Sequence, residues 1–262
     1  MSEQRFSDGV LVRRHEHGVV ELVMDRAEAR NAISTEQAHG IAAAGAAIAA
    51  ESEVRAVVLT SADPKAFCVG ADLKERNRFT DEELRAQRPV MRAAFGGVLA
   101  LPMPTIAAVA GYALGGGFEL ALSCDLLVVD ENAVLGLPEV SVGLVPGGGG
   151  TQLLPRRVGW SRALDLICTA RHLTAAEADA VGLVDRRVPA GDARSTALRL
   201  ADTIAANSPV GVRAAKRAMR TGSALDLAAG LDVEDAAWRE TAFSPDRGEG
   251  IAAFNEKRRP VF

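Results

Sequence analysis

The stretch Gly111–Asp125, GYALGGGFELALSCD, joins three consecutive glycines to a run of residues that favours a helix. Glycine lets a backbone approach a ligand closely and adopt turns that other residues avoid. A helix beginning after residues 115–117 would present unpaired N–H groups and the positive end of its dipole, which favour an anion or an oxygen that becomes anionic during a reaction. A tight strand-to-helix turn that needs glycine only for packing explains the triplet equally well.

Glu119, which lies in this run among apolar neighbours, also has two interpretations. An acidic side chain in the first turn of a helix is stabilised by the helix dipole. A carboxyl group buried among apolar residues instead has a raised pKa, which suits general acid–base catalysis. A second isolated acid, Glu139, stands beside another glycine-rich turn in LGLPEVSVGLVPGGGG. The two carboxylates suggest paired acid–base chemistry, although their spacing in the sequence does not show that they meet.

Strands alternate with helices on both sides of this stretch. Alternating apolar residues predict a β-hairpin over residues 10–25, and short apolar runs predict strands over 55–61, 104–111 and 125–130. A helix is expected over about 81–101, between the strands predicted over 55–61 and 104–111. The alternation predicts an α/β protein with a largely parallel sheet.

The helices are marked by capping signals. Ser34 with Gln37, and Thr174 with Glu177, have the spacing of capping boxes. From about residue 192 onward the chain reads as nearly all helical, and Ser244 before Pro245 predicts the cap of a last helix. The coarse prediction is a β-rich first part followed by a helical last part.

Composition excludes several classes of protein. The 262 residues are 48% hydrophobic, enough for the core of one large domain or of one domain with a small appendage. A net charge of −4 gives no support for nucleic-acid binding, which favours a basic surface. The polar N-terminus shows no signal peptide. The uncharged stretch over 93–118 is broken by prolines and glycines, so no membrane span is expected.

Familiar ligand motifs are missing from the sequence. Neither glycine cluster, 115–117 or 147–150, fits a dinucleotide-binding fingerprint, and no Gly-Lys pair exists for a phosphate loop. The three cysteines form no C-x-x-C pair, so we expect no disulfide framework and no metal site, and a reducing cytoplasm fits best.

The segment 106–126, IAAVAGYALGGGFELALSCDL, resembles the signature of the enoyl-CoA hydratase/isomerase (crotonase) family. Three further segments are similar to family segments in the same order: KAFCVGADLKE, LPEVSVGLVPGGGGTQLLPRRVG and GIAAFNEKR. The resemblance covers essentially the whole chain. It implies an α/β fold in which a spiral of ββα turns, residues 1–198, is followed by a helical trimerisation region, residues 199–262. A homotrimer or a dimer of trimers is implied with it.

The resemblance implies roles for the glycine triplet and for the two glutamates. The backbone N–H groups of Ala71 and Gly116 would form an oxyanion hole around a thioester carbonyl. Glu119 and Glu139 would hold one water between them and add it syn across the double bond of a 2-enoyl-CoA, giving a 3-hydroxyacyl-CoA. The expected activity is therefore that of an enoyl-CoA hydratase of fatty-acid β-oxidation. Acyl-CoA is its substrate, and no separate cofactor is expected.

The resemblance also implies a binding site for CoA. Arg26 and Ala29 lie in the segment that usually touches the nucleotide. Backbone around Val69, Ala71, Asp72 and Leu73 would line the adenine and pantetheine side, and Phe254 and Lys257 would reach the CoA of a neighbouring subunit. The loop and helix over 74–92 are expected to shape the acyl pocket.

Several alternatives stay open at this point. Part of the sequence is similar to the 3-methylglutaconyl-CoA hydratase subgroup, which makes a branched, acidic acyl group of leucine breakdown the second hypothesis. Isomerase, hydrolase, decarboxylase and dehalogenase activities also occur in the family. The same subgroup includes an RNA binder that uses a lysine-rich first helix, but the helix expected here has three glutamates and no lysine. A scaffold that binds acyl-CoA without turning it over is the remaining possibility.

Overall fold

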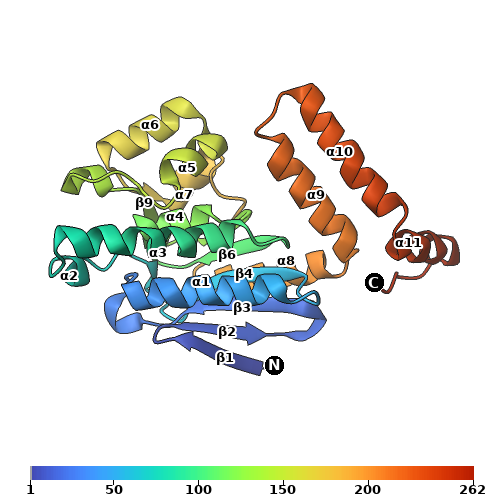
Figure 1. Cartoon of the computed structure of the whole chain (residues 1–262), viewed down its shortest axis with the longest axis horizontal. Helices are drawn as coiled ribbons and strands as arrows, with labels where there is room; N and C mark the ends of the chain where they lie inside the picture. Colours follow the sequence, from blue (N-terminus) through green and yellow to red (C-terminus); the bar gives the residue numbers. More distant parts are fainter. Residues whose placement is uncertain (1) are drawn as a thin grey trace.

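Two β-sheets form the body of the protein, and helices cover them (Figure 1). The structure is a computed structural model and describes residues 2–262. The larger sheet has the strand order β1-β2-β3-β4-β6-β8-β11. Its strands are β1 (Ser2–Ser7), β2 (Val10–Arg14), β3 (Val19–Met24), β4 (Ala56–Ser61), β6 (Thr105–Val109), β8 (Leu126–Asp130) and β11 (Arg186–Val188). The smaller sheet has the order β10-β9-β7-β5, with β5 (Ala66–Cys68), β7 (Tyr112–Leu114), β9 (Val134–Gly136) and β10 (Leu173–Thr174).

The parallel pairing predicted from the sequence is confirmed over most of the larger sheet. β2 and β3 form the predicted antiparallel hairpin, and β3, β4, β6, β8 and β11 pair in parallel. Three times in succession the chain passes from a strand of the larger sheet to a strand of the smaller one and then into helix. These passages are β4 to β5, β6 to β7 and β8 to β9. The repeated passage is a spiral of ββα turns.

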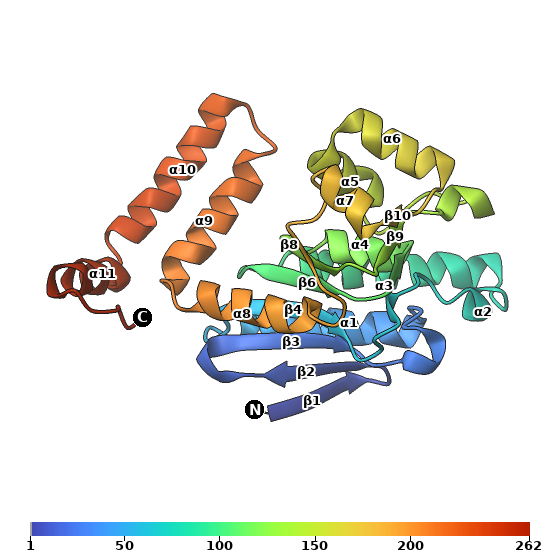
Figure 2. The same cartoon turned by 180° about the vertical axis from the view of Figure 1, so that it is seen from behind.

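The helices fall into two groups. Those that pack on or between the sheets are α1 (Thr35–Ala50), α2 (Leu73–Arg76), α3 (Asp81–Leu99), α4 (Gly116–Leu122), α5 (Gly150–Val158), α6 (Trp160–Thr169), α7 (Ala175–Ala180) and α8 (Ala193–Ala205). The last three are α9 (Pro209–Gly222), α10 (Leu227–Ala242) and α11 (Pro245–Glu256). Short 3-10 turns are η1 (Glu16–Gly18), η2 (Ala27–Ala29) and η3 (Glu139–Val142). As Figures 1 and 2 show, α9 to α11 extend away from the body that holds both sheets.

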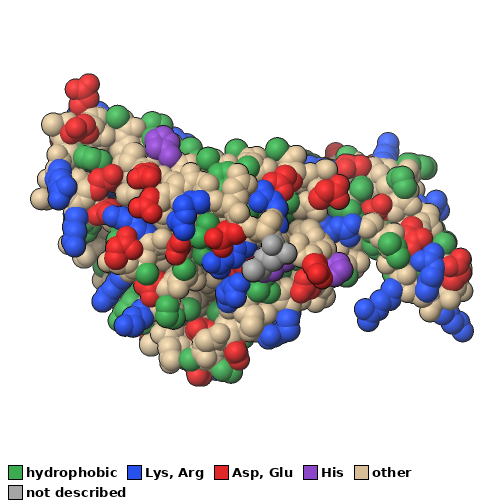
Figure 3. Space-filling view, turned by 90° about the horizontal axis from the view of Figure 1, so that it is seen from below, with side chains coloured by type: hydrophobic (Ala, Val, Ile, Leu, Met, Phe, Trp, Pro, Cys, Tyr) green, Lys and Arg blue, Asp and Glu red, His purple; other side chains and the backbone are tan. Residues whose placement is uncertain are grey.

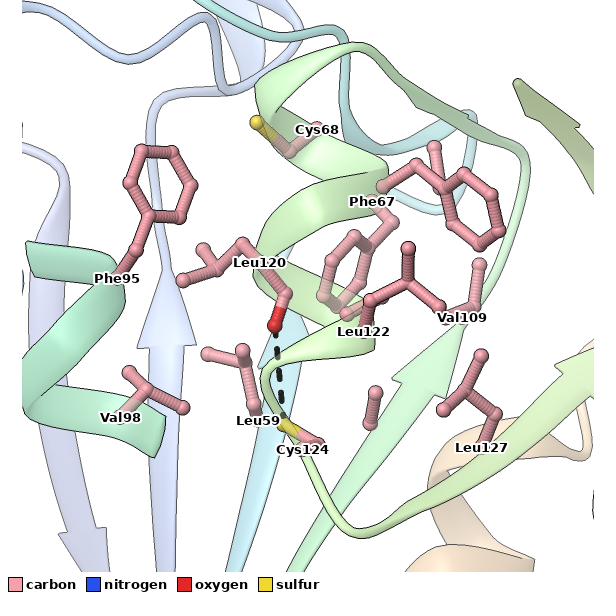
Figure 4. Close-up of a cluster of buried hydrophobic side chains, with 14 of the residues drawn as sticks. Leu59, Phe67, Cys68, Phe95, Val98, Val109, Leu120, Leu122, Cys124 and Leu127 are labelled. Carbon is pink, nitrogen blue, oxygen red and sulfur yellow. Dashed lines mark hydrogen bonds between the residues drawn. The ribbon is translucent and has the colours of Figure 1, made fainter. Parts of the chain in front are cut away.

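The core has one part on each face of the larger sheet. On one face, side chains of α1, α3 and α4 pack against apolar strand residues. Figure 4 shows this part around α4, where Leu120 and Leu122 lie among side chains from β4, β5 and α3. On the other face, α8 presents an alanine at every fourth position, namely Ala193, Ala197, Ala201 and Ala205. This spacing puts the four small side chains on one stripe, so α8 can lie close to the sheet.

The predicted division after residue 198 remains a prediction. Residue 198 lies inside α8, and the alanine stripe packs on the sheet along the full length of that helix. Beyond α8, large apolar side chains are exposed on the helices that extend from the body. They include Met219, Leu227, Leu231, Trp238, Phe243 and Phe254.

The capping predictions are confirmed in part. Thr174 and Glu177 form a complete capping box at α7. Ser34 accepts from the N–H of Gln37, but the Gln37 amide donates to the Gly9 carbonyl, so the reciprocal half of that box is wrong. Pro245 is the first residue of α11 as predicted, whereas the Ser244 hydroxyl donates to the Thr241 carbonyl and does not cap the helix. Within the described residues, no helix is long and apolar enough to cross a bilayer.

Candidate active site

Each glycine of the triplet has its own structural reason. Gly115 precedes α4 with φ +53°, in the region that favours glycine. A Cβ atom on Gly117 would stand 2.0 Å from the Cys68 carbonyl oxygen, so only glycine lets α4 pack on β5. A Cβ atom on Gly116 would stand 3.7 Å from the backbone nitrogen of Ala71. The packing interpretation is confirmed for Gly117, and the interpretation as an anion site stays a prediction that rests on Gly116, which faces a second segment of backbone.

Two backbone N–H groups are left without partners where these segments meet. Gly116 is the first residue of α4, so its N–H has no acceptor within the helix. Ala71 and Ile33 form an isolated parallel β-bridge, in which the Ile33 N–H donates to the Gly70 carbonyl and the Asp72 N–H donates to the Ile33 carbonyl. The Ala71 N–H takes part in neither hydrogen bond. Across residues 2–262, neither N–H donates to a protein acceptor. Free backbone N–H groups are the kind of donor that stabilises negative charge on a substrate oxygen.

Glu119 is held by the second glycine cluster. Its Oε1 accepts hydrogen bonds from the N–H groups of Gly148, at 2.7 Å, and Gly150, at 2.8 Å. The residue is 3% exposed, and burial raises the pKa of this carboxyl even though the N–H groups of the glycine loop lower it. Glu119 is thus a buried acid fixed by backbone donors.

Glu139 faces the same space from η3. The residue is half-buried, and its Oε2 has no hydrogen-bond partner among the described residues. Burial raises the pKa of Glu139 to about 7, and the negative charge of Glu119 contributes to the rise. Glu119 and Glu139 line a single cavity, which supports the hypothesis that the two carboxylates act on one site. An unpartnered buried carboxyl oxygen is a place for a water or a substrate group.

The cavity that joins these groups has a volume of ≈ 430 Å³. Gly116, Ala71, Glu119 and Glu139 all line it. Its apolar walls come from α3, from the end of η3 and from the segment after it, and they include Leu84, Met91, Phe95, Val142, Leu144 and Val145. An apolar chamber with a few convergent polar groups is the usual form of a small-molecule site.

The residues expected to bind CoA are brought together only in part. Val69 and Leu73 line the cavity beside Ala71. Arg26 and Asp72 lie outside its lining and bind each other, with Arg26 Nη1 2.8 Å from Asp72 Oδ2. Asp72 also caps α2. Ala29 lies in η2, close along the chain to Arg26.

Phe254 and Lys257 lie far from the cavity of their own chain. Phe254 is on α11 with 83% of its surface exposed, and Lys257 follows that helix. Figure 1 shows α11 at the opposite end of the molecule from α2. Within one chain these residues do not join the site.

Sequence reasoning missed two pairs of groups in the site. The N–H groups of Gly148 and Gly150 were not expected to bind Glu119, because the cluster over 147–150 was compared only with nucleotide-binding loops. Arg76 and Arg88 line the cavity and were covered only by the expectation that residues 74–92 shape the acyl pocket. The available signal was the presence of five arginines in a segment expected to line an acyl pocket.

Charge is not concentrated on the face of the molecule drawn in Figure 3, where acidic and basic side chains are interspersed. No group of three or more potential metal ligands occurs among residues 2–262.

Comparison with known proteins places this site in context. The family model described as enoyl-CoA hydratase/isomerase matches residues 14–262. A Bacillus subtilis protein named putative enoyl-CoA hydratase/isomerase YngF is 43% identical over 95% of each chain. The human mitochondrial methylglutaconyl-CoA hydratase is 41% identical, over 100% of this chain and 79% of that protein.

Solved structures agree with the sequence comparison. The crystal structure of enoyl-CoA hydratase from Bacillus anthracis has a TM-score of 0.95 and 40% sequence identity, and the match covers 97% of this chain and 98% of that chain. The predicted fold class is therefore confirmed: the protein has the crotonase fold, with helices at its C-terminus.

Proposed function

The chain belongs to the enoyl-CoA hydratase/isomerase family, and from this premise we propose that it is a hydratase that adds water to a 2-enoyl-CoA. The observation that carries the proposal is the presence of two carboxyl groups and two free N–H groups in one cavity. A hydratase needs both an acid and a base, and this cavity offers one carboxyl group for each role.

In the proposed reaction the thioester oxygen accepts hydrogen bonds from Ala71 and Gly116. Ionised Glu119 takes a proton from water as the water oxygen bonds to Cβ of the substrate. The electrons of the double bond move toward the thioester, and negative charge gathers on its oxygen. One donor of such a hole is commonly worth about 3–4 kcal/mol in the transition state.

Glu139 completes the addition by giving its proton to Cα. The raised pKa of about 7 keeps a share of Glu139 protonated near neutral pH, as this role requires. The products are a 3-hydroxyacyl-CoA, protonated Glu119 and ionised Glu139. A proton passing from Glu119 to Glu139 through the next water restores the starting state. The chemistry calls for no cofactor beyond the CoA thioester.

A second candidate is the hydration of 3-methylglutaconyl-CoA, which carries a carboxylate at the end of its acyl group. The human relative of that name aligns with the whole of this chain. An enoyl-CoA isomerase is a further alternative from the family description. It would move the double bond within the same cavity without consuming water.

Assembly and location belong to the proposal as well. We propose a homotrimer or a dimer of trimers, in which the exposed apolar side chains of α9 to α11 are covered and Phe254 and Lys257 reach a neighbour's CoA. A cytoplasmic location is supported by the Bacillus subtilis relative, although mitochondrial relatives also exist. We propose no nucleic-acid partner.

The testing experiment is hydration of crotonyl-CoA beside 3-methylglutaconyl-CoA, followed by loss of the enoyl-thioester absorbance. Turnover of either supports the hydratase, and the faster one identifies the preferred acyl group. If neither loses absorbance while a 3-enoyl-CoA is converted to its 2-enoyl isomer, the protein is an isomerase and the hydratase proposal is wrong.

A further inference from the structure

Two guanidinium groups line the same cavity as the two glutamates. Arg76 is the last residue of α2, and Arg88 lies in the middle of α3. Burial lowers the pKa of Arg76, and the positive charge of Arg88 lowers it further, against the opposing effect of Glu75. The two like charges are therefore close enough to affect each other in a partly apolar chamber.

Neither arginine has a carboxylate partner. The ion pairs of residues 2–262 include no pair of Arg76 or Arg88 with an acid within 4.0 Å. Arg76 Nε donates to Gln87 Oε1 at 2.9 Å, and Arg88 donates no hydrogen bond to a described residue. The Nη groups of both side chains remain available to a ligand.

The surrounding polar groups hold Arg76 in place, and none of them forms an ion pair with it within 4.0 Å. Gln87 is 4% exposed, and its amide nitrogen donates to Thr35 Oγ1 at 2.8 Å and to Glu75 Oε2 at 3.1 Å. Both oxygens of Glu75 also accept from the N–H of Thr35. The Glu75 carboxylate is thus bound to the start of α1 and does not pair with Arg76. Two neighbouring guanidinium groups that form no ion pair with a described residue within 4.0 Å offer charge-assisted donors to a bound anion.

Arg88 lies beside the loop that binds the catalytic carboxylate. A Cβ atom on Gly147 would stand 2.9 Å from Arg88 Nη1, and a Cβ atom on Gly148 would stand 2.9 Å from Glu119 Oε2. Consecutive Cα atoms are about 3.8 Å apart, so the Arg88 guanidinium and the Glu119 carboxylate lie against neighbouring residues of one loop. The adjacent apolar wall belongs to α3 and to residues 142–145.

From this arrangement we propose that Arg76 and Arg88 bind a carboxylate at the far end of the acyl group, and that the substrate is a 2-enoyl-CoA with an acidic acyl chain. The inference rests on the hydratase proposal and names its substrate class. Gln87 is a positioning residue that orients Arg76. A methyl-terminated acyl chain of the same length leaves both charges unpaired, so it binds more weakly.

The test compares glutaconyl-CoA, whose five-carbon acyl group ends in a carboxylate, with its ω-amide, which has the same shape and no charge. The wild-type protein is expected to have a kcat/KM for the acid at least tenfold above that for the amide, because a charge-assisted hydrogen bond to a buried anion is worth about that factor or more. Arg88→Gln should remove most of this preference. Arg76→Gln should do the same, and Arg88 is the safer site because its side chain is more exposed.

Arg85→Gln is the matched control. Arg85 lies on α3 one turn before Arg88, its side chain is 78% exposed, and it is absent from the cavity lining. The acid-to-amide ratio should not change in this variant.

Three outcomes overturn the inference. One is a wild-type ratio near one. Another is an equal fall for the acid, the amide and crotonyl-CoA in Arg88→Gln, which would assign the arginines to the phosphates of CoA. The third is an Arg85→Gln variant that loses the preference as well.

Binding measurements distinguish failure of the hydratase proposal from failure of the proposed carboxylate site. Glutaryl-CoA and its ω-amide are saturated and do not react, so their dissociation constants are measured by calorimetry whatever the reaction is. Tighter binding of glutaryl-CoA that is lost in Arg88→Gln supports the acidic subsite even if no 2-enoyl-CoA is hydrated. Equal binding of the two compounds contradicts it even if crotonyl-CoA is hydrated.

Discussion

The carboxylate of Glu139 lies against the backbone of Gly115, so that a Cβ atom on Gly115 would stand 3.2 Å from Glu139 Oε1. The first glycine of the triplet therefore does two things. It adopts a positive φ before α4, and it leaves room for the acid that the proposed reaction uses.

Gly115→Ala should consequently reduce hydration at least tenfold, because the new methyl group moves Glu139 and strains the turn that presents the Gly116 N–H. The measurement is kcat/KM for crotonyl-CoA. Gly182→Ala is the control, since Gly182 has φ +74° and no neighbour within 4 Å of an added Cβ. Equal losses in the two variants would show that backbone strain alone is responsible.

Replacing either glutamate should remove one half of the acid–base pair. Glu119→Gln and Glu139→Gln are each expected to lower kcat by about 10²–10⁴-fold, with the fold unchanged by circular dichroism. Glu82→Gln, at the exposed start of α3, should behave like the wild type. A glutamine variant that keeps full turnover would exclude that glutamate from the chemistry.

The rate of hydration should depend on pH through both carboxyl groups. Glu139 has a pKa raised to about 7 and must be protonated to donate, so kcat/KM should fall as the pH rises through 7. Glu119 must be ionised to act as the base, so activity should also fall toward acidic pH. Because burial raises the pKa of Glu119, this fall should begin at a higher pH than the ordinary pKa of a glutamate would give. Glu139→Gln should lack the alkaline fall. A rate that instead increases through pH 7 would mean that Glu139 acts in its ionised form.

The charge cluster around Asp125 should stabilise the attachment of α9 to the body. Asp125 Oδ2 lies 2.6 Å from Lys216 Nζ, and Oδ1 lies 2.7 Å from Arg220 Nη2. Burial alone would raise the pKa of Asp125, but the charge and hydrogen bond of Lys216, together with the hydrogen bonds from Thr105 and Arg220, hold that pKa below its usual value. Asp125→Asn leaves a partly buried cation without its counterion, so it should lower the free energy of unfolding by about 3 kcal/mol in urea.

The control for Asp125 is an exposed pair on the same helices. Glu240→Gln removes the partner of Arg217, both side chains being about half exposed, and should cost under about 1 kcal/mol. The stability that Asp125 adds should be present above its unfolded pKa and be lost as the pH falls through its lower folded value. A similar loss in both variants would contradict a special role for the buried cluster.

Much of the fold was predictable because its signals are local. The hairpin of β2 and β3 follows from alternation around His17 and Gly18, and the complete box at α7 follows from Thr174 and Glu177. The reciprocal half of the box at Ser34 was wrong because the Gln37 amide binds a carbonyl of another segment, Gly9. Such a contact depends on tertiary packing, which local spacing does not encode.

The site was predictable where glycine or burial leaves a trace in the sequence, and less so elsewhere. Glu119 and Glu139 stood out as acids among apolar residues, and they line one cavity. Arg76 and Arg88 did not stand out, because arginines on helices are commonly solvated. Their significance comes from what they lack, a carboxylate partner, and only the folded chain shows that.

The backbone of residues 147–150 also bears on the handedness of the product. Because Glu119 Oε1 is occupied by two N–H groups, only Oε2 is left to accept a proton from water. With the thioester oxygen bound by the N–H groups of Ala71 and Gly116, as proposed above, a base held in this way would deliver water to one face of the double bond. A planar alkene attacked from a single face gives one enantiomer, so the glycine loop would act as the chiral selector of the reaction.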